Sequence, residues 1–146
     1  MKVVLQRVKF AKCTVDDNVT GSINEGYMLL VGYTHTDNDE INQKMAKKIA
    51  NLRIFEDENG KMNLDIKKIG GSILSISQFT LYANTNEGNR PSFVNAMNPI
   101  EANKLYHMFN DHLREYGLVV EEGIFGAHME IELLNNGPVT ICLEFN

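Results

Sequence analysis

The sequence predicts an α+β fold, a single domain with a mainly antiparallel, barrel-like β-sheet and two main helices. Short strand-like runs joined by tight turns occupy most of the 146 residues, and two segments carry helical periodicity. The hydrophobic fraction of 43% and the charged fraction of 23% are ordinary for a globular protein. The chain is long enough for one sizeable core, so we expect one domain over residues 1–146.

The first strand-like runs lie near the N-terminus. Residues 2–10 alternate loosely between apolar and polar side chains, and residues 13–15 continue the pattern. Residues 26–34, GYMLLVGYT, form a nearly continuous apolar run, which indicates a buried strand.

The first helix is predicted from a cap and a stripe. Asp37 is a suitable N-cap, and Glu40 stands three residues later, at the spacing of a capping box. The apolar residues that follow share one face of the helix, whereas the neighbouring lysines lie off it. The apolar stripe is Ile41, Met45, Ile49 and Leu52, and the lysines are Lys44, Lys47 and Lys48.

The second helix has clearer ends. Asn98 precedes Pro99, which suits the first helical position, and Glu101 follows at the third. Gly117 is a favourable residue for the end of the helix. The predicted apolar face is Leu105, Phe109, Leu113 and Tyr116.

Two further turns are predicted. Residues 57–60, Asp-Glu-Asn-Gly, read as a hairpin tip, because Asn-Gly suits a type I′ turn. Strand-like runs then cover residues 118–121, 129–134 and 139–145, and Asn-Asn-Gly-Pro joins the last two. The simplest interpretation of that joint is a hairpin turn. The alternative is a cis bond before Pro138, found in about 5–6% of X-Pro bonds, whose carbonyl oxygens could form a pocket wall free of side chains.

Net charge limits the partners. The chain carries a net charge of -5 and a pI of about 5.3, which argues against coating nucleic acid by bulk attraction but leaves room for a pocket that takes one RNA end. A basic group could contact phosphates, although a solvated surface is the simpler interpretation. The group consists of Lys44, Lys47, Lys48, Lys67 and Lys68. No apolar run approaches a membrane span, and we expect a cytoplasmic protein.

The usual catalytic motifs are missing. The chain contains no G-x-S-x-G, H-E-x-x-H, P-loop or G-x-G-x-x-G motif. The four histidines, His35, His107, His112 and His128, are each interpreted as solvent-facing or as satisfied core residues. We therefore expect neither a self-contained nucleophile–base pair nor a metal or other cofactor.

Residues 75–82, SISQFTLY, do not fit an ordinary buried strand. Strand alternation would place Ser75, Ser77, Phe79 and Leu81 on one face and Ile76, Gln78, Thr80 and Tyr82 on the other. Polar and apolar side chains would then mix on both faces. Buried hydroxyl and amide groups are costly unless they find partners. The segment is either the end of a core strand or part of a binding site.

Two segments resemble the paired signature motifs of the D-aminoacyl-tRNA deacylases, formerly called D-tyrosyl-tRNA deacylases: residues 77–81, SQFTL, and residues 136–140, NGPVT. Other segments fit in order: QRV at 6–8, NLRIF at 51–55 with GKMN at 60–63, RPSF at 90–93, and GIFGA at 123–127 with Met129. The resemblance covers essentially the whole chain. It departs mildly at KFAKCTVDD near the start, where small apolar residues are more usual.

The resemblance implies a homodimer that hydrolyses the ester between a D-amino acid and the terminal adenosine of tRNA. Such enzymes spare L-aminoacyl-tRNA and can act on glycyl-tRNA. The implied catalytic group is Ser77, Gln78, Phe79 and Thr80, and the implied substrate-binding group is Gly137, Pro138, Phe125 and Met129. The Gly-Pro motif would be cis and would enter the partner's pocket, with Arg7 steadying its loop. Core packing is the alternative for Phe125 and Met129, and a surface charge the alternative for Arg7.

Because Thr80 has no evident base, the sequence favours hydrolysis without a covalent intermediate, assisted by the ribose 2′-OH. Two other functions remain open. A non-catalytic module could bind the 3′ end of RNA, and a hydrolase could cleave small free esters. The lack of a self-sufficient catalytic pair disfavours the second.

Overall fold

The computed structural model describes all 146 residues. The strands are β1 (Lys2–Val15), β2 (Asn18–Ile23), β3 (Gly26–Gly32), β4 (Phe55–Glu56), β5 (Met62–Leu64), β6 (Ser72–Ser77), β7 (Val119–Glu122) and β8 (Glu130–Glu144). The helices are α1 (Asp39–Asn51), α2 (Pro99–Glu115) and the short 3₁₀-helix η1 (Phe79–Tyr82). No helix has the length and apolar character that crossing a membrane would require.

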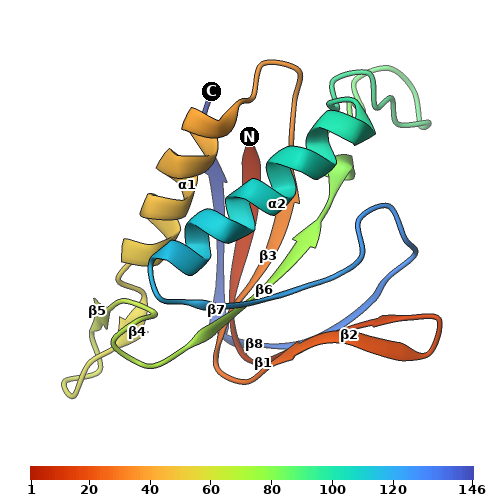
Figure 1. Ribbon diagram of the computed structural model, residues 1–146. Coiled ribbons are helices and arrows are strands. Elements are labelled where there is room, and N and C mark those ends of the chain that lie inside the picture. Colours follow the sequence, from red (N-terminus) through yellow and green to blue (C-terminus); the bar gives the residue numbers. More distant parts are fainter.

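Six strands form one mixed sheet (Figure 1). Strand β1 pairs antiparallel with β2, β3 and β8, whereas the β3–β6 and β6–β7 pairs are parallel. A parallel pair needs a long crossover, and the two helices lie in the two crossovers. The predicted α+β class, barrel-like sheet and two helices are confirmed, with parallel pairs added to the expected antiparallel ones.

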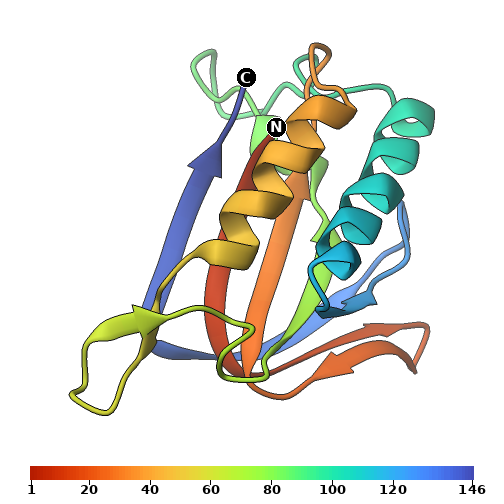
Figure 2. The same cartoon turned by 60° about the vertical axis from the view of Figure 1, so that its left-hand side comes forward.

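The sheet curls until its edges nearly meet. A Cβ atom built on Gly21 of β2 would lie 2.9 Å from the carbonyl oxygen of Glu122 in β7, so only glycine permits this approach. Both helices cover one face of the sheet (Figure 2). The main core of 23 buried residues lies between them and the sheet, and a second cluster of seven lies around β1, β2, β3 and β6.

Helix α1 begins one residue later than predicted. Its N-cap is Asn38, whose side chain accepts a hydrogen bond from the Ile41 N–H at 3.2 Å. Asp37 is engaged elsewhere, because its carboxylate accepts from the Thr34 N–H at 2.7 Å and from the Met1 amino group at 2.5 Å. The predicted stripe through Met45 and Ile49 is buried as expected.

Helix α2 has the predicted N-terminus, with Asn98 as N-cap followed by Pro99. Its buried face is rotated slightly from the prediction, since Leu105 is only half-buried and Tyr106 is buried. The Tyr106 hydroxyl donates to the Ser75 carbonyl at 2.7 Å, and burial raises the pKa of Tyr106 to about 12. A tyrosine can join this face because its hydroxyl finds an acceptor.

The hairpin at residues 57–60 is confirmed as the β4–β5 connection, but its turn is not type I′. A type I′ turn needs positive φ at both central residues, and here Gly60 has a φ of 72° while Asn59 stays negative. Positive φ at two successive residues occurs instead at Asp16 (48°) and Asp17 (63°), which join β1 to β2. Strand β2 was not predicted.

The segment at residues 135–138 is not a hairpin turn. It lies inside β8, which runs beside β1 along its whole length (Figure 1). Gln6 pairs with Thr140 and Val8 with Asn135, so a step of two residues in β1 faces a step of five in β8. The surplus residues form a bulge, here called the Gly-Pro loop (residues 135–139). Its Gly137-Pro138 peptide bond is cis.

Candidate active site

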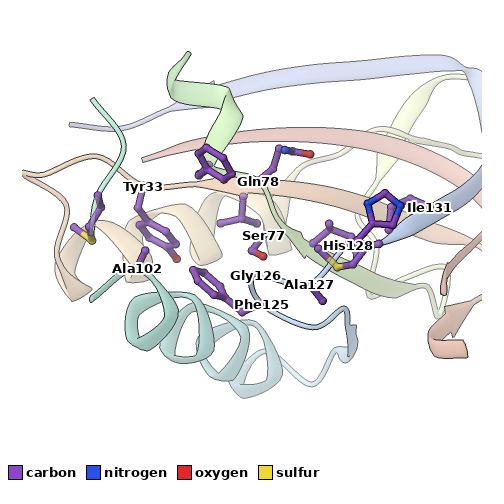
Figure 3. A pocket seen from close by; sticks show the side chains of 15 residues that line it. Tyr33, Ser77, Gln78, Ala102, Phe125, Gly126, Ala127, His128 and Ile131 are labelled. Carbon is purple, nitrogen blue, oxygen red and sulfur yellow. The ribbon is translucent and has the colours of Figure 1, made fainter. Parts of the chain in front are cut away.

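A pocket of about 250 Å³ opens where β3 and β6 end, between η1, the start of α2 and the loop before β8 (Figure 3). Tyr33, Ser77 and Phe125 face one another across it, and His128 lies to one side near Ile131. The full lining is Val31, Gly32, Tyr33, Ile76, Ser77, Gln78, Phe79, Met97, Ala102, Phe125, Gly126, Ala127, His128, Met129 and Ile131.

The end of β6 explains the mixed pattern of SISQFTLY. The strand stops at Ser77, and residues 79–82 turn into η1, so the strand faces predicted beyond Ser77 are wrong. The Gln78 N–H still donates to the Val31 carbonyl at 2.7 Å, which anchors the turn to β3. The polar residues therefore leave the sheet where the pocket begins.

Gln78 and Thr80 are coupled to each other. The Gln78 Nε2 donates to the Thr80 Oγ1 at 2.5 Å. Thr80 is exposed and makes no hydrogen bond to a histidine or carboxylate, and it is not among the lining residues. Phe79 is 56% exposed and packs edge-on against Phe93 at a ring distance of 5.1 Å.

The pocket lining carries no Asp, Glu, Lys or Arg. The Tyr33 hydroxyl donates to the Asn42 Oδ1 at 2.9 Å, and burial raises the pKa of Tyr33, so this phenol stays neutral. His128 is exposed on the pocket side, where the sequence interpretation treated it as solvent-facing or core. No group of three or more potential ligands is placed to hold a metal ion.

Phe125 and Met129 line the pocket and also touch the cores. Both are half-buried, and Phe125 lies 6.0 Å from the Tyr106 ring. Met129 packs against the second core cluster. Each of the two residues therefore forms part of the pocket wall and also packs against a core cluster.

The Gly-Pro loop lies away from this pocket. Gly137 and Pro138 are exposed, and neither lines the pocket. Arg7 is buried under the loop, with its Nε donating to the Asn136 carbonyl at 2.9 Å and its Nη1 to the Ile54 carbonyl at 2.6 Å. The interpretation of Arg7 as a surface charge is wrong.

Gly137 fits this loop because it lacks a side chain. Its φ is 139°, in the region that favours glycine. A Cβ there would lie 2.8 Å from the Val139 Cγ2 and 3.0 Å from the Arg7 Nη2. The backbone of the loop is thus closely supported from below while its outer surface is open.

The two signature segments are separated along the sheet. Gln78 is bonded to Val31, which pairs with Val3, whereas the Gly-Pro loop lies beside Arg7. Four residues of strand at about 3.3 Å each separate the two segments by about 13 Å along β1. Within one chain the structure brings together Ser77, Gln78, Phe79, Phe125 and Met129, and it leaves Gly137, Pro138 and Arg7 elsewhere.

Several lining residues were not predicted from the sequence to be site residues. They are Tyr33, Met97, Ala102, Gly126, Ala127 and His128. The GIFGA segment was the available signal for the loop before β8. The others come from elements whose meeting point depends on the parallel sheet order, which the sequence pattern did not predict.

Similarity to known proteins places this chain among hydrolases that act on ester bonds. Residues 4–144 match the family described as D-Tyr-tRNA(Tyr) deacylase. The chain belongs to this family, as the sequence motifs implied.

Two relatives share the name D-aminoacyl-tRNA deacylase. The one from Bacillus pumilus (strain SAFR-032) is 54% identical over 144 residues, 99% of this chain and 98% of its own length. The one from Deinococcus radiodurans is 53% identical over 99% of each chain.

Two solved structures share the fold. One, named c-Myc DNA Unwinding Element Binding Protein, has a TM-score of 0.93 at 39% identity and covers 100% of this chain and 99% of its own. The other, a probable eukaryotic D-amino acid tRNA deacylase, has a TM-score of 0.85 at 16% identity over 97% of each chain, a likeness of fold alone.

Proposed function

We propose that the protein hydrolyses the ester bond of D-aminoacyl-tRNA, and of glycyl-tRNA, while sparing L-aminoacyl-tRNA. The observation that carries the proposal is that the family match spans residues 4–144 and that its signature residues Ser77, Gln78 and Phe79 line the pocket at the end of β6. Aminoacyl-tRNA is a cytoplasmic substrate, and the protein would act there as chiral proofreading for translation.

The chemistry proposed here uses no covalent intermediate. Ester hydrolysis needs an attacking water and stabilisation of the oxyanion. The pocket offers no carboxylate, and the Thr80 hydroxyl has only Gln78 as a side-chain partner. The 2′-OH of the terminal ribose would therefore help to activate the attacking water, and the protein would hold the reacting groups in place.

Main-chain donors are proposed for the oxyanion. The first N–H groups of a helix have no acceptor within it. Phe79 and Thr80 begin η1, and neither donates to a backbone carbonyl outside η1 or to a side chain. Ser77 and Gln78 would orient the ribose and the ester, and Phe125 and Met129 would contact the adenine face.

Chiral selection is assigned to the Gly-Pro loop of a second copy. The carbonyl oxygens of the exposed residues Gly137 and Pro138 would hold the substrate amino group, so that an L side chain would point into the backbone and a D side chain would point outward. The separation of the two segments by about 13 Å along β1 supports a site shared between copies, because the loop of one chain does not reach the pocket of that chain. Arg7, held between two carbonyls, would keep the loop rigid.

The test is ester loss from matched D- and L-tyrosyl-tRNA. The proposal expects release of D-tyrosine and survival of the L-ester. Equal release from both would contradict chiral selection, and release from neither would contradict the enzyme function.

A non-catalytic nucleic-acid binder is the second candidate. It is favoured by the name of the structure at 39% identity, which says that that protein binds a DNA element. The net charge of -5 opposes binding to duplex DNA by bulk attraction. This candidate expects affinity for nucleic acid without release of amino acid.

A further inference from the structure

A groove of about 710 Å³ lies between α1 and the end of β8, on the side of α1 that faces β8 in Figure 2. Its lining consists of Lys44, Lys47, Lys48, Asn51, Leu52, Arg53 and Phe145. Four of these seven residues are cationic and none is acidic. On a chain with a net charge of -5, this is a local reversal of sign, and we call it the basic groove.

The lysines of the basic groove form one stripe. Lys44, Lys47 and Lys48 stand three and four residues apart, so their side chains are neighbours on the helix surface. Lys44 pairs with Glu40 at 2.8 Å, whereas Lys47 and Lys48 make no ion pair. Like charges at this spacing repel one another. An anion in the groove would remove that repulsion.

The far end of the basic groove is held in place. The Arg53 Nε donates to the Asn63 carbonyl at 2.9 Å, and its guanidinium also contacts the Asn63 side chain. Lys67 adds another cation beside the groove, because its Nζ donates to the Asn51 Oδ1 at 3.1 Å. These bonds hold Arg53 against β5 and Lys67 against the end of α1.

The basic groove ends beside the Gly-Pro loop. Arg7 donates to the carbonyls of both Ile54 and Asn136, so the residue after Arg53 and the residue before Gly137 are bridged by one guanidinium. A surface that contacts the Gly-Pro loop therefore also lies close to the Arg53 end of the basic groove. From Lys44 to Asn51 the helix adds about 11 Å of cationic surface leading away from it.

We propose that the basic groove of one copy binds the phosphate backbone of the tRNA whose aminoacyl end occupies the pocket of the other copy. This inference rests on the proposed entry of the Gly-Pro loop into the partner's pocket. With the loop there, Arg53 borders the pocket mouth and the lysines of α1 follow the RNA outward. The pocket lining contains no Lys or Arg, so the groove supplies the electrostatic attraction for the polyanion.

The first experiment uses the triple variant Lys44→Gln/Lys47→Gln/Lys48→Gln and two substrates. Glutamine has nearly the helix propensity of lysine, so α1 is retained, which a thermal melt verifies. We expect the KM for D-tyrosyl-tRNA to rise about tenfold, and the slope of log KM against log salt to fall by about two to three. Hydrolysis of D-tyrosyl adenosine ester, which has the ribose but no phosphate, should be unchanged.

The control variant is Lys61→Gln/Lys104→Gln, which removes exposed charge outside the basic groove and should leave both substrates unaffected. A triple variant with wild-type KM and salt slope on tRNA would overturn the inference while leaving the proposed function intact. Wild-type protein that releases no D-tyrosine from either substrate would instead end the proposed function, and the inference with it.

A mixing experiment tests which copy supplies the groove. Triple-variant chains, whose pockets are intact, are mixed with Gln78→Ala chains, whose grooves are intact. We expect the mixed dimers to recover the low KM for D-tyrosyl-tRNA, since the working pocket then faces an intact groove. A KM that stays at the triple-variant value would show that each groove serves its own pocket and would overturn the inference.

Discussion

The pocket at the end of β6 and the Gly-Pro loop of β8 are opposite kinds of surface. The pocket is concave and lined by 15 residues, most of them apolar, with no charged carboxylate, lysine or arginine among them. The loop is exposed at Gly137 and Pro138, with the buried Arg7 beneath it. In the proposed function each surface supplies one part of the substrate site. The comparison suggests a division of recognition between an apolar pocket and an exposed backbone loop, which lie about 13 Å apart along β1.

The largest expected effect comes from placing a side chain on the Gly-Pro loop. In Gly137→Ala the Cβ meets Val139 and Arg7 at a φ of 139°, so the loop must shift. A displacement of about 1 Å at a reacting group costs about 100-fold in rate. We expect kcat/KM for D-tyrosyl-tRNA to fall by about that factor. Steady-state hydrolysis measures it.

The matched control is Gly60→Ala. Gly60 also has a positive φ, 72°, but has open space around it and lies on the β4–β5 hairpin. This variant should keep full activity. An equal loss of activity in both glycine variants would show that backbone strain at any positive-φ glycine lowers activity, and it would refute a specific role of the Gly-Pro loop.

Removing the support beneath the Gly-Pro loop should be the next largest effect. Arg7→Met leaves the Ile54 and Asn136 carbonyls without their donor in a buried place. Hydrogen bonds to charged groups contribute about 1.5–3 kcal/mol each, so we expect a loss of about 3 kcal/mol in the free energy of unfolding. Urea denaturation measures it, with Arg90→Met in an exposed loop as control. An unchanged unfolding midpoint would contradict the supporting role.

On the pocket side, a substitution at Thr80 distinguishes two mechanisms, substrate-assisted hydrolysis and nucleophilic attack by the Thr80 hydroxyl. Thr80→Val removes the hydroxyl that accepts from Gln78 at 2.5 Å, with nearly the same side-chain shape. If the reaction is substrate-assisted, kcat should fall by only about threefold to tenfold, the loss of one supporting hydrogen bond. Complete loss of turnover in a folded protein, or a trapped acyl-enzyme, would instead identify Thr80 as the nucleophile.

The smallest effect lies outside both regions, between the two helices. His112 Nε2 lies 2.8 Å from Asp39 Oδ1, and its Nδ1 lies 3.4 Å from Glu115 Oε2. Desolvation lowers the pKa of His112, but the hydrogen bonds to Asp39 and Glu115 outweigh it, so the pKa lies above its ordinary 6.5. For Asp39 the directions are reversed. Desolvation raises the pKa of its carboxyl, but the hydrogen bonds from His112, Gln43 and Asn42 together outweigh it and bring the pKa below 3.8.

The stabilisation from this pair is therefore present between pH 3.8 and 6.5. It is lost as pH rises through the folded pKa of His112 and as pH falls through that of Asp39. We expect His112→Gln to lower the free energy of unfolding by about 0.5–1 kcal/mol near pH 5.5 and by less near pH 9. A loss that did not depend on pH would show that the imidazole acts by packing alone.

The elements that the sequence predicted well have strong local signals. Helix α2 begins at Asn98–Pro99 because the cap and the fixed proline φ act within one turn. The buried run of β3 is visible because both faces are covered. The cap of α1 was misplaced because Asp37 has a partner, the Met1 amino group, that is distant in the chain.

The missed features depend on distant pairing. Strand β8 absorbs residues 135–138 as a bulge because β1 continues past them on the other side, which no local pattern reveals. The local pattern predicts strand beyond Ser77, where β6 ends, because a 3₁₀ turn and a strand end share the same residue types. The site residues came from family motifs, and the pocket lining from Tyr33 and Ala102 needed the three-dimensional arrangement.

The most direct test of the divided site mixes two inactive variants. Gln78→Ala chains keep an intact Gly-Pro loop, and Gly137→Ala chains keep an intact pocket. If the two halves come from different copies, a random mixture should regain about one quarter of wild-type activity, since half of the dimers then hold one intact site of two. Activity no greater than the sum of the two separate variants would show that each chain carries its whole site and would contradict the account.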